Sequence, residues 1–325
     1  MEKIKIAFIF QKDNIFLSGK HFDNTYYHFF MNALQRNDKL LVKNFPVDKI
    51  IDCEEMKGKI DAILLWENSP FGMPEKILNI EKLDIPVICK AGDPNRAKDS
   101  IKYHDKWKID HYFHFLHEEF FHELYPKKFN FLTLFFGLEK KLFEKTNSFD
   151  ERIKKKILLT GATGNTKISS KIINSLRNPK WNAYESYRLR TRCKNLPYVD
   201  YTPTLQHEYI NDKFSKLLQK YSAAIAATTN NPNIKYWETA GSECLTFMEI
   251  TEKNRGQYLG FKNNESCIVI NEENFEDKFL EYLDDIENPK WKEIALEGKK
   301  HAIENFDNDI AAEKLASLFS TYVHN

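Results

Sequence analysis

Short apolar runs alternate with stretches of helical spacing through the first half of the chain. The runs are continuously apolar, as in strands that are buried on both faces of a parallel sheet. Helices are expected over 24–36, with Asn24 as N-cap, from Pro74, over 96–107 and over 117–124. Strands are expected over 4–10, 40–45, 61–66, 85–92, 111–116 and 131–137. This alternation indicates βαβ units around one buried sheet.

The alternation starts again after the charged stretch 144–156, which is interpreted as a linker. Strands are expected over 156–161, 223–228, 245–250 and 267–270, and helices over 168–176, 207–221, 274–286 and 291–305, with others from 235 and after 309. The chain is therefore expected to be an α/β protein with two Rossmann-like domains, whose ligands bind outside the carboxyl ends of the strands. The N-terminal domain would span 1–148 and the C-terminal domain 149–305. A last helix over 306–325 leaves a return to the N-terminal domain open.

Length and composition agree with two packed domains. The 325 residues exceed the size at which a single hydrophobic core stops growing, and 42% of them are apolar. The 48 basic and 47 acidic residues nearly balance, which argues against a dedicated nucleic-acid binder. The five scattered cysteines form no CxxC pair, which fits a reducing compartment and offers no zinc-site spacing. Since the N-terminal apolar run is too short for a signal sequence or a membrane span, a cytoplasmic location is expected.

The most specific pattern lies in the last third of the chain. Lys235, Trp237 and Glu238 precede a turn with Ala240 and Gly241, and a strand follows. A loop with glycine and asparagine, a short strand and the stretch PKWKEIALEGKKHAIENF come next, before a last amphipathic helix. In order and spacing, this region resembles the C-terminal part of GT-B glycosyltransferases of the "glycosyl transferases group 1" type.

The resemblance implies two Rossmann-like domains that face a cleft, and an enzyme that moves a sugar from a nucleotide diphosphate, such as a UDP-sugar, to a hydroxyl acceptor. The acceptor would be a glycan or a lipid-linked molecule. The resemblance implies Glu238 as the ligand of the ribose hydroxyls and Lys235 as a neighbour of the diphosphate, with Trp237 and Thr239 on the same helix. Neither a metal nor another cofactor is expected, because helix dipoles and basic residues hold the diphosphate in this family. The alternative for Glu238 is an ordinary first-turn glutamate that complements the helix dipole.

A second pattern, TGATGN, directly follows an expected strand. Gly161 and Gly164 let backbone N–H groups approach a phosphate, and a helix follows. By the resemblance, this loop would face the donor diphosphate with Thr160, Gly161, Asn165 and Lys167. A plain strand-to-helix turn uses the same residue types and is the alternative.

The same hexapeptide resembles the opening of many short-chain dehydrogenases, and a YxxxK pattern at Tyr209 and Lys213 lies downstream. An NAD(P)-dependent oxidoreductase is therefore an alternative function. Lys167 stands where the third glycine of that fingerprint belongs, and the motif follows a whole α/β domain; both observations weigh against it. A further alternative is a GT-B-like chain without catalytic activity that acts as a binding module.

Three arginines, Arg188, Arg190 and Arg192, alternate along the segment 181–195. On a strand they would share one face, and guanidinium forks suit a diphosphate. Arg190 is therefore included among the donor-binding candidates, with a solvated edge strand as the alternative.

Acceptor chemistry is expected in the N-terminal half. The loop 11–24 is long for a strand–helix connection, and its His21 and Asp23 are candidates for the general base of an inverting reaction. Asp93, after the fourth expected strand, is the third catalytic candidate. The alternative for each of them is a turn or helix-cap residue. The basic and aromatic stretch 102–129 leaves a peripheral contact with anionic lipid at the membrane open.

Two further patterns bear on architecture and on metal binding. The segment GLEKKLF over 137–143 resembles the junction between the domains in the same family, where Gly137 would let the chain turn. The histidines between 104 and 122 lack metal-site spacing, because HEEFFH is one residue longer than HExxH. We expect them at the surface or at the edge of the core.

Overall fold

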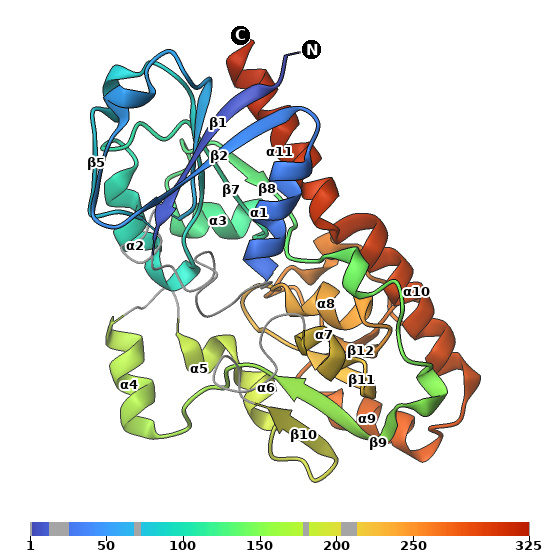
Figure 1. Cartoon of the computed structure of the whole chain (residues 1–325). Helices are drawn as coiled ribbons and strands as arrows, with labels where there is room; N and C mark the ends of the chain where they lie inside the picture. The colour runs from blue at the N-terminus through green and yellow to red at the C-terminus, as the bar shows by residue number, and fades with distance from the viewer. Residues whose placement is uncertain (1, 13–25, 68–72, 178–181, 203–212, 325) are drawn as a thin grey trace. The chain divides into compact units, whose positions relative to one another are not determined.

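The computed structural model describes residues 2–12, 26–67, 73–177, 182–202 and 213–324. It divides into two compact units, Met1–Gly137 with Asn308–Asn325, and Leu138–Asp307, called the first and the second unit below (Figure 1). The chain passes between them after Gly137 and after Asp307, rather than after 148 and 305. The charged stretch 144–156 is not a free linker, because Phe149 is buried in the core of the second unit and the Arg152 guanidinium donates to two backbone carbonyls there.

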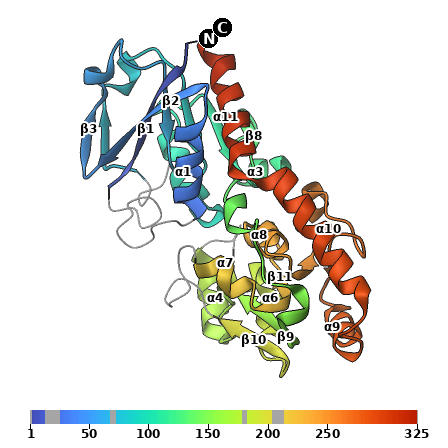
Figure 2. The same cartoon turned by 45° about the vertical axis from the view of Figure 1, so that its right-hand side comes forward.

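A six-stranded parallel sheet in the order β2-β1-β4-β6-β7-β8 forms the centre of the first unit. All six expected strands are present, since continuous apolar runs such as IKIAFIF supply buried side chains to both faces. Helices α1 (Tyr26–Arg36), α3 (Glu118–Leu124) and α11 (Asn308–Val323) belong to this unit, and α11 lies along α1 (Figure 2). The strands are β1 (Ile4–Gln11), β2 (Leu40–Val47), β4 (Ala62–Leu65), β6 (Val87–Lys90), β7 (His111–His114) and β8 (Phe131–Thr133).

Two segments of this unit differ from the expected helices. After Pro74 the chain forms β5 (Lys76–Leu78), which pairs with β3 (Ile50–Asp52) in a small second sheet. Only the middle residue of β5 is buried, so the strand is too short to show a period in the sequence. The segment 96–107 forms α2 (Ala97–Ser100) between 3₁₀ turns instead of one continuous helix.

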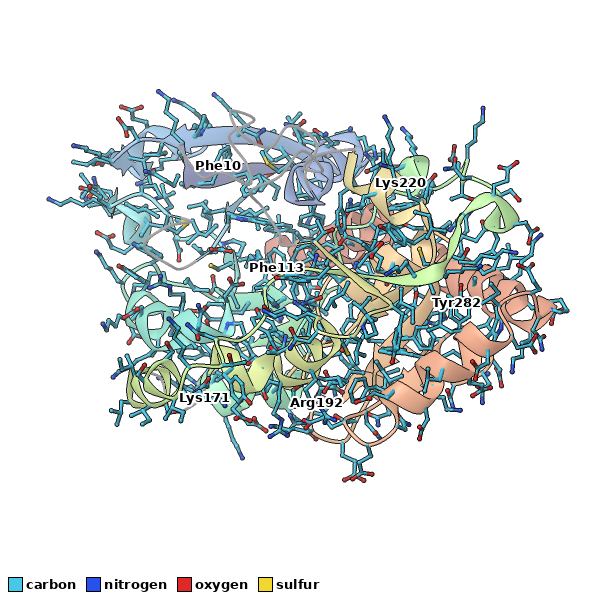
Figure 3. The ribbon with its side chains drawn as sticks, turned by 90° about the horizontal axis from the view of Figure 1, so that it is seen from below. Phe10, Phe113, Lys171, Arg192, Lys220 and Tyr282 are labelled. Atoms are coloured by element: carbon cyan, nitrogen blue, oxygen red, sulfur yellow. The ribbon has the colours of Figure 1, made fainter. Side chains whose placement is uncertain are left out.

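Most aromatic side chains of the stretch 102–129 are buried. Trp107 and Phe121 lie in the core of the first unit, and Phe113, labelled in Figure 3, is fully buried in the central sheet. This stretch therefore does not present its aromatic side chains to a lipid surface. No helix among the described residues is both long enough and apolar enough to cross a membrane.

The second unit is built around a five-stranded parallel sheet in the order β10-β9-β11-β12-β13. Counted along the chain, this order is second, first, third, fourth and fifth, so the direction of winding reverses between β9 and β11. Ligands of doubly wound sheets bind at such a switch point, beyond the carboxyl ends of the strands. The strands are β9 (Ile153–Thr160), β10 (Val199–Thr202), β11 (Tyr221–Ala226), β12 (Leu245–Glu249) and β13 (Ile268–Ile270), of which β10 is not among the expected ones.

The described part of the segment 181–195 is helical, so the three arginines do not share one face of a strand. It forms α5 (Ala183–Ser186) and α6 (Arg188–Cys193). Residues two apart lie on different sides of a helix, whereas residues four apart share a side. Arg190 therefore points inward and is buried, while Arg188 and Arg192 lie at the surface and both form ion pairs with Glu272. Figure 3 labels Arg192.

The remaining helices of this unit are α4 (Ile168–Arg177), α7 (Lys213–Leu218), α8 (Lys235–Gly241), α9 (Phe275–Asp284) and α10 (Pro289–Phe306). Helix α10 carries the PKWKEIALEGKKHAIENF pattern, and α8 packs against it. A Cβ at Gly298 would lie 2.5 Å from the Ser266 carbonyl oxygen, so only glycine allows this close approach. The repeated positions of the pattern face the interior: Trp291, Ile294, Ala295, Gly298, Ala302 and Phe306 are all buried.

Candidate functional site

A tightly anchored loop follows β9 at the switch point of the second sheet. Gly161 has a φ of +109°, a conformation that side chains rarely adopt. Its N–H donates to the Thr202 carbonyl at 3.2 Å, and its own carbonyl accepts from the Tyr201 hydroxyl at 2.9 Å. The Gly164 N–H donates to Thr191 Oγ1 at 2.7 Å. The loop is thus held in one shape by β10 and α6 before any ligand binds.

Arg190 joins the two sides of the switch point. Its Nε donates to the Ala227 carbonyl, just beyond β11, at 3.0 Å, and its Nη1 donates to the Ala162 carbonyl, just beyond β9, at 2.9 Å. The side chain is 2% exposed, and burial lowers the pKa of its guanidinium. Its Nη2 is buried and has no hydrogen-bond partner within the described part of the chain. A buried charged donor without a partner is costly in a finished interior and is typical of a ligand site.

Lys235, the first residue of α8, reaches the same point from the other side. Its Nζ donates to Thr160 Oγ1 at 3.2 Å and lies 4.8 Å from the centre of the Phe214 ring. A Cβ on Gly161 would lie 2.8 Å from Lys235 Cε and 2.9 Å from Arg190 Nη1, so both cations close over this glycine. Desolvation by the surrounding protein, reinforced by the charge of Arg190, lowers the pKa of Lys235 to about 8.

Two buried carboxylates accompany the cations. Glu238 lies one helical turn after Lys235, is 8% exposed, and accepts no side-chain hydrogen bond among the residues that the structure describes. Burial raises the pKa of Glu238 to about 7, although the charge of Lys235 opposes the shift. Glu249 ends β12, and burial raises its pKa to about 7 as well, with Arg190 opposing. One Glu249 oxygen, Oε2, is buried without a partner among the described residues.

Sequence reasoning did not single out Glu249. Its signal was available, because an acid at the carboxyl end of a continuously buried strand stands where ligands of parallel sheets bind. The resemblance also implied that helix dipoles help to hold the diphosphate, which at α8 would involve free N–H groups in its first turn. The Lys235 and Tyr236 N–H groups instead donate to Asn233, through its side chain and its carbonyl. These two N–H groups are therefore already paired within the chain.

Four of the predicted donor-site residues lie outside this group. Trp237 is fully buried and stacks on Phe306 with ring centres 5.0 Å apart. Thr239 Oγ1 donates to the Lys235 carbonyl within the helix at 2.6 Å. Asn165 and Lys167 are exposed, and the Asn165 side chain accepts from the Lys167 N–H at 3.0 Å just before α4. Internal packing thus accounts for the Trp237 and Thr239 side chains and a local turn for that of Asn165, while the Lys167 side chain is exposed.

In the first unit, His21 and Asp23 lie outside the described residues. Asp93 follows β6 at the carboxyl edge of the sheet, and its side chain is exposed. Desolvation by nearby protein, then the negative charge of Glu67, raises the pKa of Asp93. Lys90, the last residue of β6, is fully buried, and its Nζ donates to Glu67 Oε1 at 2.8 Å. No three His, Cys, Asp or Glu side chains among the described residues gather as a metal site.

Neither a scan of protein-family profiles nor a search of curated protein sequences finds a match. Solved structures do resemble the chain. HepE of Anabaena, solved with UDP-glucose, has a TM-score of 0.58 and 11% identity, covering 98% of this chain and 100% of its own. A glycosyltransferase from Rickettsia africae has a TM-score of 0.58 and 10% identity, covering 100% of both chains. Sucrose-phosphate synthase from Thermosynechococcus elongatus has a TM-score of 0.57 and 11% identity, covering 98% of this chain and 99% of its own. At identities this low, the structural similarity shows the fold alone. That fold is the expected pair of Rossmann-like units.

Proposed function

We propose that this chain, which has the GT-B fold of those neighbours, transfers a sugar from a nucleotide-diphosphate donor to a hydroxyl acceptor, and that the donor binds on the second unit. The observation that carries the proposal is the convergence of Arg190 and Lys235 over Gly161 at the switch point of the sheet. Arg190 is fastened to both neighbouring strand ends and keeps one N–H group, at Nη2, without a described partner. HepE, of the same fold, was solved with UDP-glucose, which supports a UDP-sugar as the donor.

The charges of the site suit a diphosphate. A nucleotide-diphosphate sugar carries two negative charges on its diphosphate, and Arg190 and Lys235 supply two positive ones. Both cations are desolvated before the ligand arrives, so their attraction for an anion is stronger than in water. Burial lowers the pKa of Lys235, and an adjacent diphosphate would raise it again and keep the ammonium charged. We therefore propose that donor binding needs no metal ion.

Glu238 is proposed to hold the ribose. It lies one turn along α8 from Lys235. In a nucleotide the ribose is likewise next to the diphosphate, so the two side chains would meet these two groups. Its carboxylate is buried and without a described hydrogen-bond donor, so two ribose hydroxyls would satisfy it. Burial raises its pKa to about 7, and the hydroxyl donors would lower that pKa on binding.

In the proposed reaction, the bond between the anomeric carbon and the diphosphate oxygen breaks, and its electron pair leaves with the nucleoside diphosphate. The acceptor oxygen forms the new bond to the anomeric carbon, and its proton passes to a base. Arg190 and Lys235 stabilise the charge that develops on the leaving group. His21, Asp23 and Asp93 remain the candidates for the base. Of these, Asp93 is described, and it follows β6 at the carboxyl edge of the first sheet, where ligands of parallel sheets bind.

A matched pair of arginines on one helix tests the donor site. We expect Arg190→Met to weaken UDP binding, measured by calorimetry, at least tenfold, because a buried charge-assisted contact is lost. Arg192→Met changes an exposed arginine two residues away and should bind UDP like the wild type. Equal affinities of both variants would refute the site.

Turnover separates the remaining alternatives. Release of UDP from UDP-glucose in the presence of an acceptor would establish a transferase, whereas tight UDP binding without release would indicate an inactive binding module. Thermal stabilisation by NAD(P)⁺ instead of nucleoside diphosphates would support the oxidoreductase, which no feature of the site favours.

A further inference from the structure

Helix α4 is amphipathic, and its apolar side faces solvent. Ile168, Ile172 and Leu176 are four residues apart and form one stripe, with Ile173 beside it. These side chains are 75%, 56%, 78% and 47% exposed, in that order. No residue of α4 whose side chain is described is buried. A crossover helix of a parallel sheet normally packs its apolar stripe against the sheet, so α4 departs from this pattern.

The polar side of α4 holds it to the second unit. Lys171 Nζ lies 3.7 Å from the centre of the Tyr184 ring, and Asn182 Nδ2 donates to Ser175 Oγ at 2.7 Å. Both partners lie on or next to α5, and Figure 1 shows α4 and α5 side by side, while Figure 3 labels Lys171. The helix is therefore attached with its apolar side turned outward. An exposed aliphatic stripe of this kind marks an interaction surface.

The sequence of α4 and its immediate flanks carries positive charge only. Residues 165–182 contain Lys167, Lys171, Arg177 and Lys180 and no acidic residue, in a chain whose net charge is only +1. Lys167 is exposed, whereas the Lys171 ammonium lies over the Tyr184 ring. Basic residues beside an exposed aliphatic stripe characterise helices that lie in the plane of a membrane surface.

We propose that α4 docks the protein on an anionic lipid bilayer, with its aliphatic stripe among the acyl chains and the exposed Lys167, just before the helix, at the lipid phosphates. A second copy of the chain is a poorer occupant, because it would bring the same positive charge to the contact. The aromatic stretch 102–129 does not compete for this role, since most of its aromatic side chains are buried. The proposal does not depend on the donor chemistry of the same unit.

Sedimentation with vesicles tests the proposal on the full chain. Wild type should sediment with vesicles of phosphatidylcholine and phosphatidylglycerol, and less with phosphatidylcholine alone. A basic residue near an anionic surface contributes roughly a fivefold gain in partitioning, so Lys167→Ser should lose about fivefold. Ile172→Ser with Leu176→Ser should abolish binding. Leu280→Ser with Leu296→Ser is the matched control, because these leucines are exposed on α9 and α10.

Each outcome decides the proposal. Weaker binding of the Lys167 variant and loss of binding in the Ile172 and Leu176 variant, with binding kept in the control and melting temperatures unchanged, would support it. Absence of wild-type binding to anionic vesicles would overturn it, and so would unchanged binding of the Ile172 and Leu176 variant. A dimer in sedimentation velocity that becomes monomeric in that variant, without vesicle binding, would show that α4 meets a second copy instead.

Discussion

Replacing Gly161 by alanine tests the donor site with one methyl group, because that group would meet both cations. The residue has a φ of +109°, and its Cβ would lie 2.8 Å from Lys235 Cε and 2.9 Å from Arg190 Nη1. Arg190 cannot move aside without losing its 2.9 Å hydrogen bond to the Ala162 carbonyl. Lys235 would lose its 3.2 Å bond to Thr160 Oγ1. The variant therefore strains the loop and displaces the proposed diphosphate ligands together.

The loss of stability can be worked from three contributions. Backbone strain at a non-glycine residue costs about 1 to 3 kcal/mol. A displaced hydrogen bond to a charged group costs about 1.5 to 3 kcal/mol. The lower entropy of alanine in the unfolded chain offsets about 0.4 to 1 kcal/mol of this. The net destabilisation is roughly 2 to 5 kcal/mol, so the melting temperature should fall by on the order of 10 °C.

Calorimetry with UDP, at a temperature where the variant is still folded, measures the effect on the site. The Kd should rise at least tenfold, which corresponds to about 1.4 kcal/mol. Gly260→Ala is the control within the same unit, because its φ is +74° and its Cβ would lie 3.1 Å from the His301 ring. It should lower the melting temperature and leave the Kd unchanged. A folded Gly161→Ala protein that binds UDP with the wild-type Kd would refute the assignment of Arg190 and Lys235.

Three further predictions follow from the same residues and from the core. The affinity for UDP-glucose should be highest between about pH 7 and 8, because the pKa of Glu238 is about 7 and that of Lys235 about 8. At lower pH Glu238, the proposed ribose ligand, is protonated, and at higher pH Lys235 loses its positive charge. Titration of Kd against pH checks this. The Glu238→Gln variant should not show the loss of affinity at low pH. Gly298→Ala should lower the melting temperature, since overpacking against the Ser266 carbonyl costs about 1 to 3 kcal/mol and exceeds a gain in helix propensity of about 1 kcal/mol. EDTA should leave the Kd for UDP unchanged, and a loss of binding that Mg²⁺ or Mn²⁺ restores would contradict metal independence.

The alternating pattern predicted most of the fold because parallel strands buried on both faces leave a continuous apolar signal. Strands such as β1 and β12 are almost wholly buried, so no register or partner need be known to find them. The pattern failed where that signal is short. β5 buries one residue, and β10 has a single buried position, Val199. The prediction of a linker over 144–156 was wrong. The many charged residues of this stretch gave no sign that the second unit buries Phe149 and Arg152.

The resemblance in the last third of the chain rests largely on packing. The repeated positions of α10 and the ring of Trp237 fill the interior of the second unit. They establish the fold of the segment and say little about ligands. Thr160, Gly161 and Lys235 do lie in contact, whereas Asn165 and Lys167 precede α4. Their roles toward a donor remain predictions, and no periodicity in the sequence could have separated the two groups.

The departure of α4 from the sheet explains how Arg190 reaches the switch point. The connection from β9 to β10 must cover one face of the sheet with apolar side chains. Because α4 turns its apolar stripe away, α6 fills that place, and Leu189 and Cys193 enter the core beside Ile157 and Leu159. That packing turns Arg190, which follows Leu189 on α6, inward at the carboxyl ends of β9 and β11. A strand, the conformation considered for the alternating arginines, would have placed Arg188, Arg190 and Arg192 on one surface. The helix instead separates a buried cation for the proposed donor from two surface cations that pair with Glu272.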